Sequence, residues 1–161
     1  MNNILDELRA KIESEGFEQE DKRLNRKVKS IPGHFIIITG EALDSLKVDK
    51  PLEKYGEDWK RMYSTFKLAV KTAQGYKDSR RLMVLNDSRY AKIFQCFTHL
   101  QFVYTHRNEF DMYVYLRSSD LDKLKDDLVF FSHVMKKFES KVKIPTTKLV
   151  VIFGNVHFEV K

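Results

Sequence analysis

Cysteine and long apolar runs are both scarce in this chain of 161 residues. The only cysteine, Cys96, has no partner for an internal disulfide, which is typical of proteins in a reducing compartment, so we expect a cytoplasmic protein. No apolar run approaches the ~20 residues that cross a bilayer, and the opening stretch, "MNNILDELRAKIESEGF", lacks the apolar core of a signal peptide. We therefore expect a soluble protein that does not use a membrane as a partner.

Common motifs of nucleotide and metal chemistry are missing as well. The sequence has no glycine-rich phosphate loop, no paired-cysteine or closely spaced histidine site and no nucleophile elbow. We therefore expect no bound metal, and any chemistry must come from residues that are scattered along the chain.

The net charge of +6 comes from 29 basic and 23 acidic residues, and most of the two kinds are interleaved. Interleaving favours solvated surfaces over a nucleic-acid interface. Two basic clusters stand out: the run "KRLNRKVK" at 22–29, and the pair Arg80 and Arg81, which precedes an apolar stretch. Paired guanidinium groups match phosphate oxygens, so this pair is a candidate phosphate clamp.

Apolar periodicity predicts one α+β domain with a mostly buried sheet. Residues 1–24 are interpreted as an N-terminal helix and a polar linker, which extends over "FEQEDKRLNRK", and 25–161 as the main domain. The predicted helices cover 2–14, 57–73 and 121–142; the predicted strands cover 33–40, 81–86, 96–104, 110–116, 148–154 and 156–160, with a short helix or loop over 87–94. The last two strands are predicted to be separated by a break at Gly154 and Asn155.

Several motifs follow one another in an order that resembles the thymidylate synthase family, including its pyrimidine-nucleotide hydroxymethylases. They are "DSRR", "QCFTHLQF", "LRSSD", an apolar helix and "FGNVHFEV", and "YGEDW" extends the resemblance towards the front half. The resemblance implies a shortened thymidylate synthase-like fold, in which a mixed sheet carries flanking helices. It also implies a protein that binds a pyrimidine nucleotide, dUMP or dCMP.

Residue by residue, the resemblance assigns Cys96 as the nucleophile that adds to carbon 6 of the pyrimidine. Its thiol needs a nearby positive charge to ionise, and Arg117 would supply that charge while it also binds the nucleotide phosphate. Ser118 would bind the phosphate too, and His157 would hold the sugar hydroxyl. The other interpretation of Cys96 is a small apolar residue that packs in a strand.

Three further positions concern the base and the subunit arrangement. Asp120 would support the base, and Asp127 would recognise it, since a carboxyl group there suits cytosine. Asp127 could equally serve only the helix macrodipole beside Asp126. Arg80 and Arg81 would reach the phosphate of the neighbouring subunit's nucleotide, which implies a homodimer.

The family's one-carbon donor, 5,10-methylenetetrahydrofolate, is implied by the resemblance as the cofactor, but the folate machinery is the part that matches least. Only "EALDSLKVDKPLEK" stands where the family has a long helix that bears a glutamate, and Gln95 and Phe97 flank the cysteine in place of proline and histidine. Three hypotheses remain open: a transferase that adds a one-carbon unit at carbon 5, a homodimer that binds the nucleotide without this chemistry, and a scaffold for a protein partner.

Overall fold

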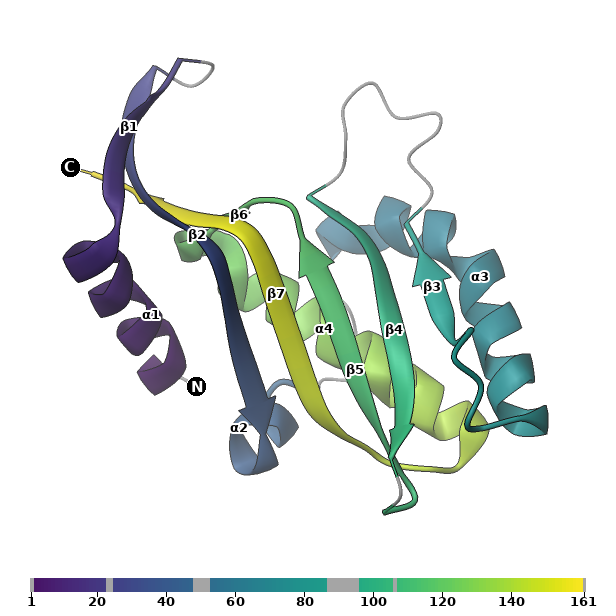
Figure 1. The fold of residues 1–161 in the computed structure, drawn as a ribbon. Coiled ribbons are helices and arrows are strands. Elements are labelled where there is room, and N and C mark those ends of the chain that lie inside the picture. Colours follow the sequence, from purple (N-terminus) through teal and green to yellow (C-terminus); the bar gives the residue numbers. More distant parts are fainter. Residues whose placement is uncertain (1, 23–24, 48–52, 87–95, 106, 161) are drawn as a thin grey trace.

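The computed structural model describes residues 2–22, 25–47, 53–86, 96–105 and 107–160. These residues form an α+β fold in which a seven-stranded mixed sheet carries four packed helices (Figure 1). The elements are α1 (Asn2–Glu15), β1 (Phe17–Asp21), β2 (Arg26–Thr39), α2 (Gly40–Asp44), the 3-10 helix η1 (Glu53–Tyr55), α3 (Gly56–Gly75), β3 (Met83–Leu85), β4 (Phe97–Thr105), β5 (Glu109–Leu116), β6 (Ser119–Asp120), α4 (Leu121–Val142) and β7 (Thr146–Glu159). Among the described residues, no helix is long and apolar enough to span a membrane.

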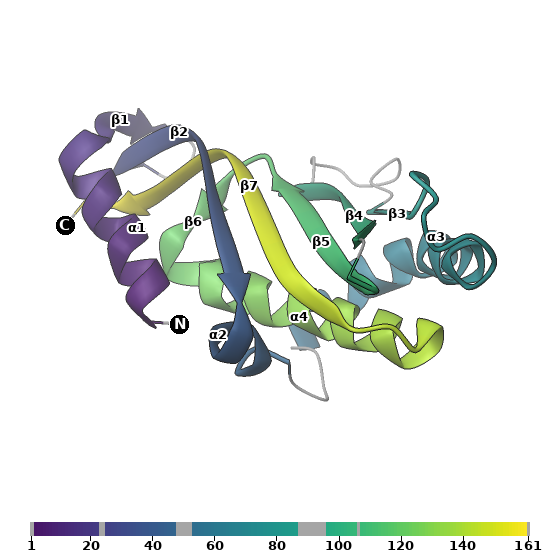
Figure 2. The ribbon, with the colours of Figure 1, turned by 60° about the horizontal axis from the view of Figure 1, so that its bottom comes forward.

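The strands lie in the order β1-β2-β7-β5-β4-β3, and β6 pairs with β7. Neighbouring strands are antiparallel except for two pairs: β7 runs parallel to β5 and to β6, while it is antiparallel to β2. A parallel pair needs a crossover, and α4 provides it between β5 and β7. Figure 2 shows α4 lying across one side of the sheet, with α3 beside it.

The two faces of the sheet differ sharply in burial. One row of cross-strand neighbours, which faces the helices, is fully enclosed: Ile36, Val151, Val114, Leu100 and Val84 are each at most 7% exposed. The next row points to the opposite face and consists of Phe35, Ile152, Tyr115, His99 and Leu85. Phe35 is 56% exposed and Leu85 44%, so none of the described helices covers these side chains.

Helix α4 confirms the prediction for 121–142. Its apolar stripe, which includes Leu124, Leu128 and Phe138, is completely buried against the sheet. The helix begins with Asp120 as its N-cap, because the Asp120 carboxylate accepts a hydrogen bond from the backbone N–H of Asp122 at 3.1 Å. It ends at Val142, and the C-cap residue Lys143 has a left-handed backbone with φ of 60°. The predicted helix at 57–73, realised as α3, and the predicted hairpin of β4 and β5 are confirmed too.

Two predictions for the strands are wrong. The supposed linker at 17–27 contains β1, which forms a hairpin with β2 through five backbone pairs, from Phe17↔Ser30 to Asp21↔Arg26. The supposed break at Gly154 and Asn155 does not exist, because β7 continues to Glu159 and stays in register with β2. What changes at Gly154 is the alternation of burial in β7, which switches from odd-numbered to even-numbered residues. Of the other predictions, the short helix or loop over 87–94 lies outside the described residues.

Candidate functional site

Most of the predicted site residues lie at one end of the sheet, where β4 begins and β5 ends. We call this the upper end, because it is at the top of Figure 1. Cys96 immediately precedes β4 and Arg117 immediately follows β5. The backbone N–H of Arg117 donates to the carbonyl oxygen of Cys96 at 2.7 Å, so antiparallel pairing holds the two residues side by side. The side chains of both are exposed.

Gly154 brings the next strand against Arg117. A Cβ atom at this position would lie 2.7 Å from the backbone oxygen of Arg117 and 2.9 Å from the hydroxyl of Tyr115. Real Cβ atoms do not approach a backbone oxygen so closely, so the absence of a side chain allows β7 to pass β5 here. The glycine that sequence reasoning took for a strand break is therefore required for close packing at the upper end.

Asp120 and His157 are brought together by the short parallel pairing of β6 with β7, in which they are Cα partners. One oxygen of the Asp120 carboxylate caps α4, and the other lies 3.5 Å from the Arg26 guanidinium and 3.8 Å from the Lys123 ammonium. Arg26 also pairs with Glu159 at 3.3 Å. Asp120 thus serves mainly to cap α4 and to pair with neighbouring basic side chains. The charge of Arg26 is already balanced by the carboxylates of Asp120 and Glu159.

His157 is half-buried, and burial lowers the pKa of its imidazole below the ordinary value, while the Asp120 carboxylate opposes part of that shift. The ring is therefore neutral at neutral pH. A neutral imidazole has one donor and one acceptor nitrogen, which suits recognition of a hydroxyl group.

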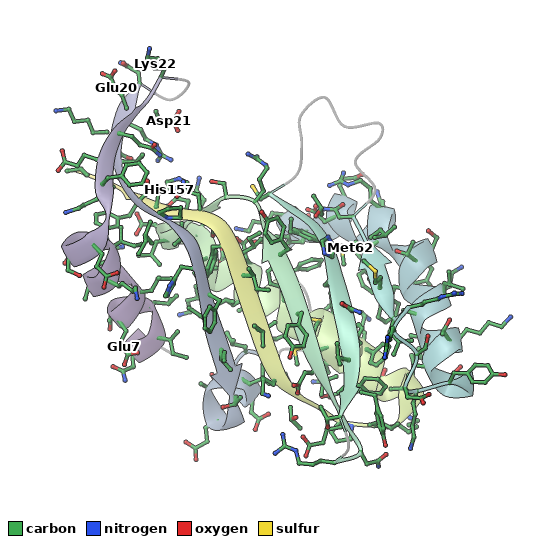
Figure 3. All side chains as sticks on the ribbon, in the orientation of Figure 1. Glu7, Glu20, Asp21, Lys22, Met62 and His157 are labelled. Carbon is green, nitrogen blue, oxygen red and sulfur yellow. The ribbon has the colours of Figure 1, made fainter. Side chains whose placement is uncertain are left out.

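A cleft of about 420 Å³ lies beside His157, between the β1–β2 hairpin and the last part of β7. Figure 3 shows the hairpin residues Glu20, Asp21 and Lys22 above His157. The cleft is lined by Gln19, Glu20, Asp21, Lys22, Val28, Ser118, Asn155 and His157. Of the predicted site residues, Ser118 and His157 therefore share this cleft, and the hairpin residues are additions that sequence reasoning missed. The segment "FEQED" carries no apolar alternation, so only the basic run at 22–29 drew attention to this region.

One buried polar atom of the cleft lining, Asn155 Oδ1, has no hydrogen-bond partner among the described residues. The buried hydroxyls of Ser30 and Ser119, which do not line the cleft, have none either. Ser30 is the cross-strand partner of His157, and Ser119 is the partner of Val156. Buried polar groups are normally satisfied, so the unpartnered Asn155 Oδ1 indicates that a polar ligand or water completes it at the cleft.

Asp127 is not among the cleft residues. Its carboxylate accepts a hydrogen bond from the hydroxyl of Tyr55, whose ring is stacked on Phe130 with centroids 4.6 Å apart. Burial raises the pKa of Asp127, and the bond from Tyr55 opposes part of that rise. The structure therefore places this predicted base-reading group against η1, in a partly buried contact within the chain.

Arg80 and Arg81 lie in the turn before β3, away from the upper end. The carbonyl oxygen of Arg80 accepts a bond of 3.1 Å from the side chain of Gln101, which is five residues along from Cys96. At about 3.3 Å per strand residue, this corresponds to roughly 16 Å. Within one chain, the two arginines therefore do not join Cys96 and Arg117.

Comparison with known proteins adds no relative: no protein-family model matches the chain, and no curated protein matches it. Among the described residues, no group of histidine, cysteine, aspartate and glutamate side chains could hold a metal ion. What the fold and the site define is a class, an α+β protein with a polar cleft at one end of a mixed sheet.

The lowered pKa of His157 leads to a prediction about stability. An unfolded chain takes up a proton at this histidine near pH 6.5, whereas the folded protein does so only at lower pH. The free energy of unfolding should therefore decrease as the pH falls below about 6.5. His157→Gln should remove part of this decrease, because glutamine takes up no proton in either state. Urea titrations at pH 8 and pH 5.5 measure the effect, and the pH 8 pair is the control because the imidazole is neutral there in both states. An equal acid-dependent loss in both proteins would contradict the assignment.

Proposed function

We propose that the protein binds a pyrimidine nucleotide at the upper end of the sheet. The observation that supports it best is that strand pairing gathers residues from distant parts of the sequence there. Cys96 and Arg117 are joined through their backbones, and Ser118 and His157 share a cleft with the unpartnered oxygen of Asn155. The residues that the resemblance assigns to phosphate and sugar are therefore neighbours in space.

In this proposal, the phosphate binds to Arg117 and Ser118. Arg117 is exposed and makes no ion pair with any described residue, so its guanidinium is available for a bidentate contact with an anion. Arg26 is a poorer candidate, since Asp120 and Glu159 already surround it. The neutral imidazole of His157 then binds a sugar hydroxyl.

In this proposal, Arg80 and Arg81 contact only a nucleotide that is bound to a second copy of the chain. They are too far from Cys96 along the sheet to contact the same nucleotide in one chain, and both side chains are largely exposed. We propose a homodimer in which this pair completes the phosphate site of the other copy.

A second candidate function is chemistry at carbon 5 of the bound pyrimidine, and the exposure of Cys96 beside Arg117 supports it. The resemblance names folate as the one-carbon donor, but the described residues do not fit it. Cys96 lies outside the cleft lining, so a base attacked by its sulfur has to extend from the cleft towards the start of β4. No described carboxylate is hydrogen-bonded to the thiol to relay a proton to a one-carbon donor. We therefore propose no step through folate; addition of the thiolate to carbon 6 is what the residues can perform.

Arg117→Ala tests nucleotide binding. The substitution should weaken the binding of a pyrimidine monophosphate by about ten- to a hundredfold, because a charged bidentate contact is worth roughly 1.5–3 kcal/mol. Calorimetric titration with dCMP, dUMP and the matching nucleosides measures the loss, and nucleosides should be affected far less because they lack the phosphate. Arg107→Ala is the matched control: Arg107 is also exposed, but lies at the opposite end of β4 and β5. If the wild-type protein binds no nucleotide in this panel, the proposal is wrong.

A further inference from the structure

The last part of β7 presents two polar side chains to the cleft from the same face of the strand. Beyond Gly154, Val156 and Phe158 are buried, whereas Asn155 and His157 are only half-buried. Side chains two residues apart in a strand point to the same face, with Cα atoms roughly 7 Å apart. Asn155 and His157 both line the cleft, so they form a pair of hydrogen-bonding groups on one of its walls.

This pair has hydrogen-bonding capacity that the described part of the chain does not use. Asn155 Oδ1 is an acceptor without a hydrogen-bond partner among the described residues. The imidazole of His157 makes no side-chain hydrogen bond with a described residue either, and in its neutral form it has one donor and one acceptor nitrogen. A ligand that satisfies both side chains must therefore bring a donor to Asn155 and a second polar group to His157.

The other walls of the cleft are polar as well. Val28 is the only apolar residue among the described residues that line it. The hairpin side contributes Gln19 and Asp21, and the charge of the Asp21 carboxylate acts on His157. A site that selects deoxyribose needs an apolar wall where a 2′-hydroxyl would stand, because burial of a hydroxyl without a partner is unfavourable. The described lining of this cleft provides no such wall.

A ribose matches the pair of side chains better than a deoxyribose does. In a nucleoside 5′-monophosphate, a deoxyribose has one free hydroxyl, on carbon 3′, whereas a ribose has two adjacent ones, on carbons 2′ and 3′. If His157 binds one hydroxyl, a deoxyribose leaves Asn155 Oδ1 without a donor, and the second hydroxyl of a ribose supplies it. The cleft of about 420 Å³ has room for this group, which is smaller than a water molecule of ~30 Å³.

We propose that the cleft recognises the 2′,3′-diol of a ribose, so that the ligand is a pyrimidine ribonucleotide such as CMP or UMP. His157 binds the 3′-hydroxyl, and Asn155 Oδ1 accepts a hydrogen bond from the 2′-hydroxyl. Asn155 is then the residue that determines which sugar is preferred. The inference rests on the proposed binding of a pyrimidine nucleotide, and it departs from the deoxyribonucleotides that the sequence resemblance implies.

Calorimetric titration of the wild-type protein with CMP, dCMP and 2′-fluoro-2′-deoxycytidine monophosphate tests the sugar preference. CMP should bind about ten- to fiftyfold more tightly than dCMP, because dCMP leaves the acceptor on Asn155 unsatisfied. The fluorinated nucleotide should bind like dCMP, since fluorine takes the place of the hydroxyl but cannot donate a hydrogen bond. UMP and dUMP repeat the comparison with the other base.

Variants of Asn155 test the assigned residue. Asn155→Leu removes the acceptor at similar size, so CMP should fall to the affinity of dCMP, while dCMP itself changes by no more than about threefold. Asn155→Asp retains an acceptor and should keep the preference for CMP, even where its charge weakens both nucleotides. Gln74→Leu is the matched control, because Gln74 is an amide on α3 that does not line the cleft. Circular dichroism spectra establish that each variant is folded.

The ratio of the two affinities separates recognition from a structural effect. A variant that only distorts β7 weakens CMP and dCMP alike, so a preference for CMP that persists in Asn155→Leu overturns the assignment. Equal binding of CMP and dCMP by the wild-type protein overturns the inference and leaves nucleotide binding standing. Failure of all five nucleotides to bind overturns the proposed function together with this inference.

Discussion

Cys96→Ala is expected to abolish the release of label from carbon 5 of a bound pyrimidine monophosphate while leaving nucleotide affinity within about twofold. In the proposed step, the thiolate forms a bond to carbon 6, and the π electrons of the C5–C6 bond move towards carbon 5 to give an enolate. Carbon 5 takes a proton from water, loses its original hydrogen, and expulsion of the thiolate restores the pyrimidine. The net result is exchange of one hydrogen with solvent, which needs no other reactant.

The measurement uses a nucleotide that carries tritium at carbon 5, and it counts the tritium that appears in water. Alanine removes the attacking sulfur, but the contacts assigned to phosphate and sugar belong to other residues, so binding should survive. Thr98→Ala is the matched control, because Thr98 is an exposed residue of β4, two positions beyond Cys96. If wild-type protein saturated with nucleotide releases no tritium, Cys96 is not a nucleophile towards the pyrimidine. The binding protein without one-carbon chemistry would then be the remaining function.

The three long helices, α1, α3 and α4, and the central hairpin could be predicted from the sequence because their signals are local. In α4, apolar residues recur at helical spacing from Leu121 to Phe138, and all of that stripe is buried. The hairpin of β4 and β5 alternates with period two on both sides of a polar turn. Such patterns require no knowledge of the partner element.

β1 and the cleft could not be predicted, because the residues that form them show no periodic pattern of apolar side chains. Strand β1 is held by its backbone pairing with β2, and all but one of its side chains are exposed. The walls of the cleft therefore come from residues that look like a solvated linker. Asp127 illustrates the same limit, since its position on α4 was predictable but its bond to Tyr55 depends on where η1 folds back.

The site residues, by contrast, are far apart in the sequence, and only the strand order of the sheet shows that they are neighbours. Cys96, Arg117 and Gly154 are separated by about twenty to sixty residues, yet they are consecutive across β4, β5 and β7 at the upper end. A strand break at Gly154 was the natural interpretation of a glycine followed by asparagine. The correct interpretation requires knowing that the backbone oxygen of Arg117 occupies the space where a side chain would be.

Gly154→Ala is consequently expected to be severely destabilising, with a decrease of about 2–4 kcal/mol in the free energy of unfolding. The added Cβ would lie 2.7 Å from the backbone oxygen of Arg117, and a backbone atom beside a central strand cannot move aside as a flexible side chain can. β5 and β7 must then separate at the upper end. Chemical denaturation measures the change, and nucleotide affinity should fall as well, because Arg117 and His157 are positioned by the two strands that are forced apart.

Gly75→Ala is the matched control for this substitution. Gly75 is the last residue of α3, a Cβ added there would meet no atom within 4 Å, and its backbone does not adopt a positive φ. Alanine there should be neutral or stabilising by up to about 1 kcal/mol, since it restricts the unfolded chain and favours the helix. Gly154→Ala with wild-type stability would mean that β7 does not pass β5 as closely as the structure has it. The proposed nucleotide site, which combines Arg117 with His157, would then lose its geometric basis, whatever the nucleotide titrations show.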